Sequence, residues 1–177
     1  MSAWWRSNRR ALLALVVVVP LTAGVFLGWE WWKVARYEPT FPTVAEQGRA
    51  ADFADITFGP ATATEVSLLG VTAPEGTKFL WVRVPVDRHG AATGCTLTGL
   101  RELGGQGRFW RDESKTVDWD YRRYTACPND RRSDLFPRGA FQIDVPFIVP
   151  DDVEGPLGVE LVIPDELPGY VRIVVVP

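Results

Sequence analysis

The chain has 177 residues, of which 46% are hydrophobic and 23% charged, and its formal net charge is −3. Residues 1–37 carry five basic side chains and one acidic, whereas residues 38–177 carry 14 basic and 21 acidic, so the two parts have charges of +4 and −7. Such an acidic C-terminal part argues against nucleic acid and anionic lipid surfaces as its partners. It is long enough for one domain with its own hydrophobic core.

Near the N-terminus, residues 11–29 contain no charged side chain. A run of roughly 20 apolar residues can cross a bilayer as a helix. Arg6, Arg9 and Arg10 precede it, and this basic flank predicts a cytoplasmic N-terminus. Tryptophans at both ends fit the two membrane interfaces. The alternative is a cleaved signal peptide, but no good small-x-small cleavage site follows the run.

We therefore expect four segments in a protein of the cell membrane. They are a cytoplasmic stub (1–10), an uncleaved transmembrane signal anchor (11–32), a linker (33–50) and an extracytoplasmic domain (51–177). In the linker, prolines and a glycine occur with little periodicity, which is typical of a short extended connection.

Period-two alternation of apolar and polar residues begins at residue 51 and predicts strands. The expected strands are Phe53–Phe58, Thr64–Leu69, Phe79–Val86, Cys95–Leu103, Arg108–Arg111, Phe141–Val149, Leu157–Ile163 and Tyr170–Val176. The strand Cys95–Leu103 and the strand Arg108–Arg111 form a hairpin with a glycine-rich tip. Pro146 places its strand at a sheet edge or bulge. The fold class is all-β, an Ig-like antiparallel β-sandwich of about seven or eight strands after one N-terminal transmembrane helix.

Two cysteines, Cys95 and Cys127, both lie on the side of the anchor expected to be exported. An even number of cysteines in an oxidising compartment predicts one disulfide between them. The alternatives are two free thiols or half of a metal site.

Three motifs resemble a family of exported domains of unknown function from Gram-positive bacteria, described as telokin-like or related to immunoprotective extracellular proteins. They are Gly76–Val84, Gly107–Trp110 and Phe147–Asp151, and the resemblance covers residues 52–176. It implies an N-terminal anchor, one Ig-like sandwich and a Gram-positive, actinobacterial-like source. It supplies no catalytic residues.

Equipment for catalysis is sparse. His89 is the only histidine in the chain and stands in a polar turn beside Gly90, where a solvated side chain is more common than a catalytic base. One histidine and two paired cysteines do not make a zinc site. We therefore expect no catalytic residue, no metal and no cofactor.

The long segment 112–138 contains an aromatic and basic stretch, which we call the aromatic loop. Tryptophan, tyrosine and arginine are enriched at the energetic centres of protein interfaces, and the stretch offers Trp119, Tyr121, Arg122, Arg123 and Tyr124. The alternative is that its rings close the end of the sandwich while its arginines pair with nearby aspartates.

We therefore predict a single-pass membrane protein whose outer domain is a non-catalytic module that binds a protein of the cell envelope. The alternative function is binding of a cell-wall glycan or a small solute. An enzyme is the third hypothesis.

Overall fold

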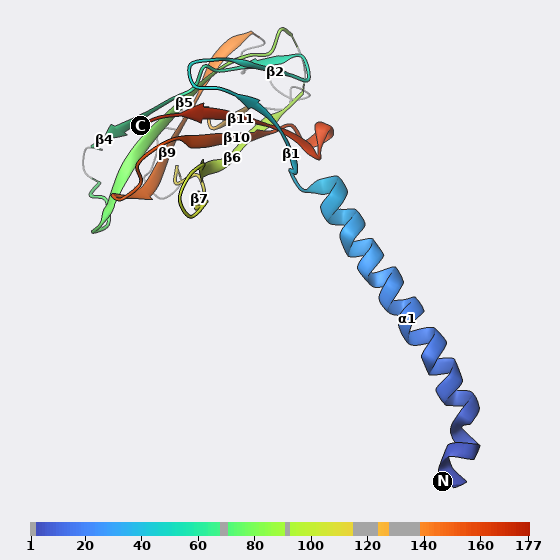
Figure 1. The fold of residues 1–177 in the computed structure, drawn as a ribbon. Helices are drawn as coiled ribbons and strands as arrows, with labels where there is room; N and C mark the ends of the chain where they lie inside the picture. Colours follow the sequence, from blue (N-terminus) through green and yellow to red (C-terminus); the bar gives the residue numbers. More distant parts are fainter. Residues whose placement is uncertain (1–2, 68–70, 91–92, 115–123, 128–138) are drawn as a thin grey trace. The chain divides into compact units, whose positions relative to one another are not determined.

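The computed structural model describes all residues except 1–2, 68–70, 91–92, 115–123 and 128–138 (Figure 1). The chain divides into two compact units, Met1–Glu38 and Pro39–Pro177. The first consists of one helix and the second consists mainly of strands, so each unit is described by itself.

Helix α1 (Ala3–Tyr37) extends beyond the expected segment 11–32 at both ends. Within its stretch Asn8–Tyr37, the most apolar window has a mean hydropathy of 2.5, and the stretch is long and apolar enough to cross a membrane. An ion pair of 3.2 Å joins Glu30, inside the expected segment, to Lys33 in the added turn at the C-terminal end, a spacing that favours helix. By length and composition, α1 is a candidate membrane span or signal anchor.

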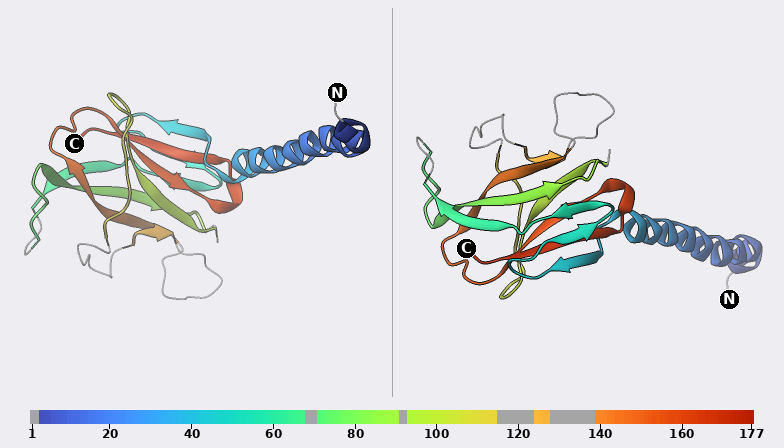
Figure 2. Two further views of the ribbon diagram at one scale, coloured as in Figure 1. Left: turned by 90° about the horizontal axis from the view of Figure 1, so that it is seen from below. Right: turned by 90° about the horizontal axis from the view of Figure 1, so that it is seen from above.

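The second unit is a β-sandwich, and the two views of Figure 2 show its strands in two layers. Sheet A has the order β1-β11-β10-β6-β7, with β8 also paired to β6; sheet B has the order β2-β3-β5-β4, with β9 paired to β5. The bounds are β1 Phe41–Ala45, β2 Ala51–Phe53, β3 Ile56–Phe58, β4 Thr62–Val66, β5 Thr77–Asp87, β6 Cys95–Glu102, β7 Phe109–Trp110, β8 Ala126–Cys127, β9 Ala140–Pro150, β10 Leu157–Val162 and β11 Gly169–Val175. A short 3-10 helix, Pro164–Glu166, joins β10 to β11.

Alternation along the strands places the core between the two sheets, as expected from the sequence. The even-numbered residues of β5 and the odd-numbered residues of β9 share the buried cluster with residues of β10 and β11. The members from β5 and β9 are Leu80, Val82, Val84, Val86, Ile143, Val145, Phe147 and Val149. The alternation therefore gave the correct inward face of both long strands.

One correction concerns the segment expected as a linker. Its residues Phe41–Ala45 form β1, which pairs in parallel with β11. The backbone amides of Thr40 and Phe41 donate to the carbonyl oxygen of Pro168, at 2.9 and 3.2 Å. This strand has no alternating pattern because it is exposed along most of its length, so its pairing depends on a partner more than 120 residues away. Among the named strands that the structure describes, the pairings are thus antiparallel except for this one.

A second correction concerns Phe53–Phe58, which was expected to be one strand. The chain reverses at Ala54 and Asp55, so β2 and β3 are the two arms of a hairpin. Both turn residues have positive φ, at 51° and 61°, as in a two-residue type I′ turn. The pair Ala-Asp does not predict such a turn, whereas Asn-Gly would, and the alternation of apolar residues continues through it.

Strand β4 (Thr62–Val66) begins two residues before the expected strand Thr64–Leu69, whose last two residues lie outside the described part of the chain. β6 and β7 form the expected hairpin. β9 pairs with only one of the named strands, β5, which agrees with the edge position expected from Pro146.

Candidate functional site

Most of the aromatic loop lies outside the described residues, namely Trp119, Tyr121, Arg122 and Arg123. Tyr124 is described and runs beside β9. Its carbonyl oxygen accepts a hydrogen bond of 2.9 Å from the amide of Asp144. Its ring contacts that of Phe141 edge-to-face, with 5.4 Å between the ring centroids. Tyr124 is thus half-buried against the sandwich, and a binding role for the loop stays a prediction.

The two cysteines form a disulfide. Cys95 opens β6, Cys127 lies opposite it in β8, and their Cα atoms are 4.6 Å apart. Both side chains are buried in the core cluster. The disulfide therefore links the chain three residues after Tyr124 to the start of β6.

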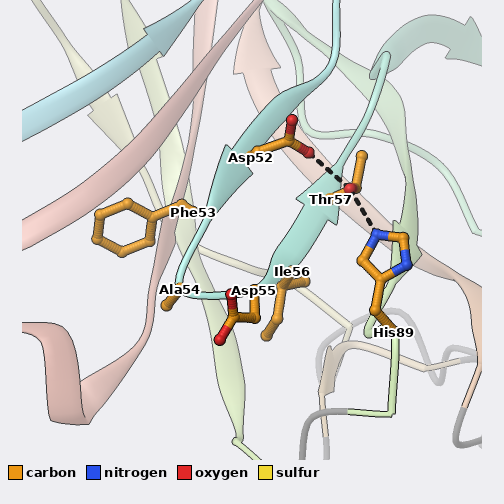
Figure 3. A pocket seen from close by; sticks show the side chains of 7 residues that line it. All are labelled: Asp52, Phe53, Ala54, Asp55, Ile56, Thr57 and His89. Carbon is orange, nitrogen blue, oxygen red and sulfur yellow. Dashed lines mark hydrogen bonds between the residues drawn. The ribbon is translucent and has the colours of Figure 1, made fainter.

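The only histidine lies beside an open depression of about 450 Å³, lined by Asp52, Phe53, Ala54, Asp55, Ile56, Thr57 and His89 (Figure 3). Thr57 Oγ1 lies 2.6 Å from Asp52 Oδ1 and 2.8 Å from His89 Nε2. The Phe53 ring points away from His89 (Figure 3). Ala54, Asp55 and His89 all have positive φ, a costly conformation for residues other than glycine.

The direction of these hydrogen bonds limits what the depression can do chemically. Thr57 has one hydroxyl proton and donates it in the hydrogen bond to Asp52 Oδ1, so the contact with His89 requires the tautomer whose Nε2–H donates to the hydroxyl oxygen. A histidine that activates a hydroxyl must instead accept that proton. Asp87 accepts a bond of 3.0 Å from the backbone amide of His89. The network orders the β2–β3 hairpin against the turn after β5.

Within the described residues, no group of three or more His, Cys, Asp or Glu side chains is placed to hold a metal ion.

A different cluster covers the outer face of sheet A, which we call the arginine face. It comprises Arg101, Glu160, Arg172, Tyr170, Phe109 and Val44, from strands β6, β10, β11, β7 and β1. Glu160 is 4% exposed, and one of its oxygens, Oε1, accepts hydrogen bonds from both arginines. Arg101 Nε donates to it at 2.7 Å, Arg172 Nη2 at 2.7 Å and Arg172 Nε at 3.2 Å.

The strand register explains why these residues meet. Arg172 lies opposite Glu160 between β11 and β10, and Val44 lies opposite Arg172 between β1 and β11. Paired residues of neighbouring strands point to the same face of a sheet. Since Val159 and Ile173 face the core, their neighbours Glu160 and Arg172 must point outward.

Two glycines let side chains lie flat across this face. A Cβ at Gly99 would stand 2.3 Å from Cζ of Phe109, so the phenylalanine ring occupies the space that a side chain would fill. A Cβ at Gly158 would stand 3.0 Å from Cγ and Cδ of Arg172. The guanidinium of Arg101 lies 4.9 Å from the centroid of the Phe109 ring, within cation–π range.

The face combines buried charge with exposed apolar surface. Phe109 is 38% exposed and Val44 is 54% exposed. The hydroxyl oxygen of Tyr170 accepts a hydrogen bond from Arg172 Nη2, and the ring of Tyr170 lies beneath that guanidinium. Burial, with Glu160 adding to it, raises the pKa of the Tyr170 hydroxyl. The hydrogen bond to Glu160 raises the pKa of Arg101, so this arginine stays charged.

A second ion cluster ties the glycine-rich hairpin tip to a neighbouring turn. Arg108 Nε and Nη2 each donate to one oxygen of Glu102 at 3.1 Å, and Nη1 donates to Asp152 at 3.0 Å. The hydrogen bonds from Arg108 lower the pKa of Glu102. Because all three nitrogens of its guanidinium form hydrogen bonds within the protein, we interpret Arg108 as a residue that stabilises the fold.

Arg88 is a third notable cation. It follows the inward row of β5 and is 1% exposed, the largest fully buried side chain among the described residues. Its Nη2 donates to the carbonyl oxygen of Thr93 at 3.2 Å, while its buried Nε has no partner among the residues that the structure describes.

No family model and no curated protein matches this chain. Among solved structures, it is similar to an uncharacterized β-sandwich protein from Clostridium difficile 630, with 10% identity and a TM-score of 0.38. The alignment covers 76% of this chain and 96% of that chain. By its own fold, the protein is a β-sandwich preceded by an apolar helix that is a candidate membrane anchor.

Proposed function

We propose that the protein is a single-pass membrane protein whose extracytoplasmic Ig-like sandwich is a non-catalytic module that binds another protein of the Gram-positive cell envelope. The basic residues before α1 support a cytoplasmic N-terminus, because cytoplasmic flanks of membrane spans are rich in lysine and arginine. The sandwich would then stand on the outer side, in the compartment where disulfides persist.

The observation that carries this proposal is the arginine face. Exposed Phe109 and Val44 flank a pair of arginines held in place by one buried glutamate. Aromatic residues and arginine dominate the energetic centres of protein interfaces. Isolated exposed apolar residues are ordinary, but here they adjoin guanidinium groups whose positions are fixed before any partner arrives.

The experiment is photo-crosslinking in living cells with p-benzoylphenylalanine placed at Val44 or Phe109 of the full-length protein. The matched control is Thr64, which is exposed on β4 of the other sheet. We expect a discrete protein adduct from both positions on the arginine face and none from Thr64. Equal, weak labelling at all three positions would contradict the proposal.

The alternative, binding of a glycan or a small solute, rests on the depression of Figure 3, where Asp52, Asp55 and His89 offer hydrogen-bonding groups beside one phenylalanine. The depression is open, whereas small-molecule sites usually enclose most of their ligand. Adducts to wall polymer from a photoreactive group at Asp55, with none from Val44, would favour this alternative.

A further inference from the structure

We propose that Arg101 is a carboxylate-binding position on the arginine face, and that the partner presents there an aspartate or glutamate next to an apolar side chain. This inference rests on the proposed function and deepens it, because it names the chemistry of the partner.

The charges of the cluster do not balance. Arg101 and Arg172 share the single carboxylate of Glu160, so among the described residues one positive charge remains without a partner of opposite sign. Only Nε of Arg101 is engaged, and its Nη1 and Nη2 bond to none of the described residues. The side chain of Arg101 is 39% exposed, against 21% for Arg172. The free end of this guanidinium is thus the accessible site of the surplus charge.

The geometry suits a carboxylate. The two terminal nitrogens of an arginine match the two oxygens of a carboxylate, which gives a bidentate, charge-assisted pair. Glu160 holds one edge of the Arg101 guanidinium, and the Phe109 ring supports it at 4.9 Å. Because Phe109 itself lies on Gly99, little side-chain freedom is lost when a ligand binds.

The net negative charge of the domain favours a protein segment over an extended polyanion as the ligand. Residues 38–177 carry a net charge of −7, which repels nucleic acid, teichoic-type polymers and anionic membranes at long range. A single carboxylate within a segment that also carries an apolar residue avoids this repulsion. Its apolar residue can cover the exposed parts of Phe109 and Val44.

The test uses the full-length protein in nanodiscs made of neutral lipid. A displayed library of random heptapeptides is selected on the wild type, with counter-selection on Arg101→Gln. The selected peptides are then synthesised in pairs, one with its acidic residue and one with the corresponding amide, and their dissociation constants are measured. Arg83→Gln is the matched control, because Arg83 on sheet B also lies over an aromatic ring, Trp81, and beside a carboxylate, Asp144.

We expect the selected peptides to contain Asp or Glu beside an apolar residue. Replacing the acid by its amide should weaken binding to the wild type and to Arg83→Gln by about tenfold or more, as for loss of a charge-assisted pair. On Arg101→Gln the same replacement should change affinity less than about twofold, because the two changes remove one interaction. Arg101→Lys keeps the charge without the planar fork, so on this variant the acid-to-amide replacement should weaken binding by a factor between those for the wild type and Arg101→Gln. If Arg101→Gln does not unfold cooperatively, Arg101→Lys is used in its place.

Three results would overturn the inference, and only the second of them would also contradict the proposed function. Suppose that Phe109→Ser weakens peptide binding and Arg101→Gln does not. The arginine face would then still be a docking face, but Arg101 would not bind a carboxylate. Peptides unaffected by both Phe109→Ser and Arg101→Gln would contradict the face as well. Arg101-dependent binding to vesicles rich in phosphatidylglycerol, with no acidic peptide selected, would also overturn the inference.

Discussion

Glu160→Gln tests whether the arginine face is held together by one buried charge. The substitution leaves Arg101 and Arg172 facing a neutral amide at a position that is 4% exposed. Removing one partner of a buried ion pair costs about 3–5 kcal/mol of folding free energy. Because both guanidinium groups retain contact with water, we place the loss at the lower end, about 3 kcal/mol.

The assay is thermal and urea unfolding of the full-length protein, followed by tryptophan fluorescence. With an unfolding entropy of about 2.1 cal/mol/K per residue, a loss of 3 kcal/mol in a unit of this size lowers Tm by roughly 10 °C. The matched control is Glu65→Gln, because Glu65 is 67% exposed and lies 4.0 Å from Lys78. An exposed pair of this kind contributes less than about 1 kcal/mol.

The reasoning would be refuted if Glu160→Gln lost no more stability than Glu65→Gln. A second comparison separates stability from function. Replacing Arg101, Glu160 and Arg172 together by apolar residues of similar size should cost little stability, since buried ion clusters often contribute no more than apolar packing. The same triple variant should no longer bind the partner.

Three further predictions concern other positions. Gly99→Ala places a Cβ against the ring of Phe109, and we expect a loss of about 1–3 kcal/mol in urea unfolding from overpacking; an unchanged midpoint would contradict the flat packing of that ring. The lowered pKa of Glu102 beside Arg108 means that its ionised form stabilises the fold above the ordinary glutamate pKa and that this contribution disappears as pH falls through the lowered value. Glu102→Gln should therefore be less stable than the wild type at pH 7 and equal to it near pH 2, measured by urea unfolding; a constant difference would show that charge is not the cause. Arg88→Met removes a buried cation whose Nε has no partner in the described part of the chain, so the free energy of unfolding should stay unchanged or rise by about 1–2 kcal/mol, and a loss above about 2 kcal/mol would contradict this expectation.

Local sequence pattern was sufficient for the elements whose two faces differ in polarity. β5 and β9 were predicted from alternation, and the β6–β7 hairpin from its glycine-rich tip. The disulfide was predicted from cysteine count and expected compartment. In each case the residues that determine the feature are close in sequence or rare in the chain.

Elements made by distant partners were missed. β1 becomes a strand because β11 provides its hydrogen-bonding partner. The residues of β1 do not alternate between apolar and polar. The β2–β3 turn was missed because Ala54 and Asp55 adopt positive φ without the glycine that usually marks such turns.

The arginine face was also missed, because its charged residues come from strands far apart in sequence. Arg101 and Glu160 are separated by 59 positions. A usable signal was nevertheless present: Glu160 and Arg172 are single charges of opposite sign in otherwise apolar strands. Such charges are buried only when they are paired, and two of them in successive strands indicate a pair across the sheet.

The most direct test of the central claim, that the arginine face binds a partner by its own chemistry, is the crosslinking yield from Val44 in two backgrounds. With p-benzoylphenylalanine at Val44, the yield of the protein adduct is compared between the wild type and Phe109→Ser, at equal amounts of folded protein. The account predicts a severalfold loss in Phe109→Ser, because the aromatic contact is removed while the reporter stays in place. An unchanged yield would show that the partner lies near this face without docking on it.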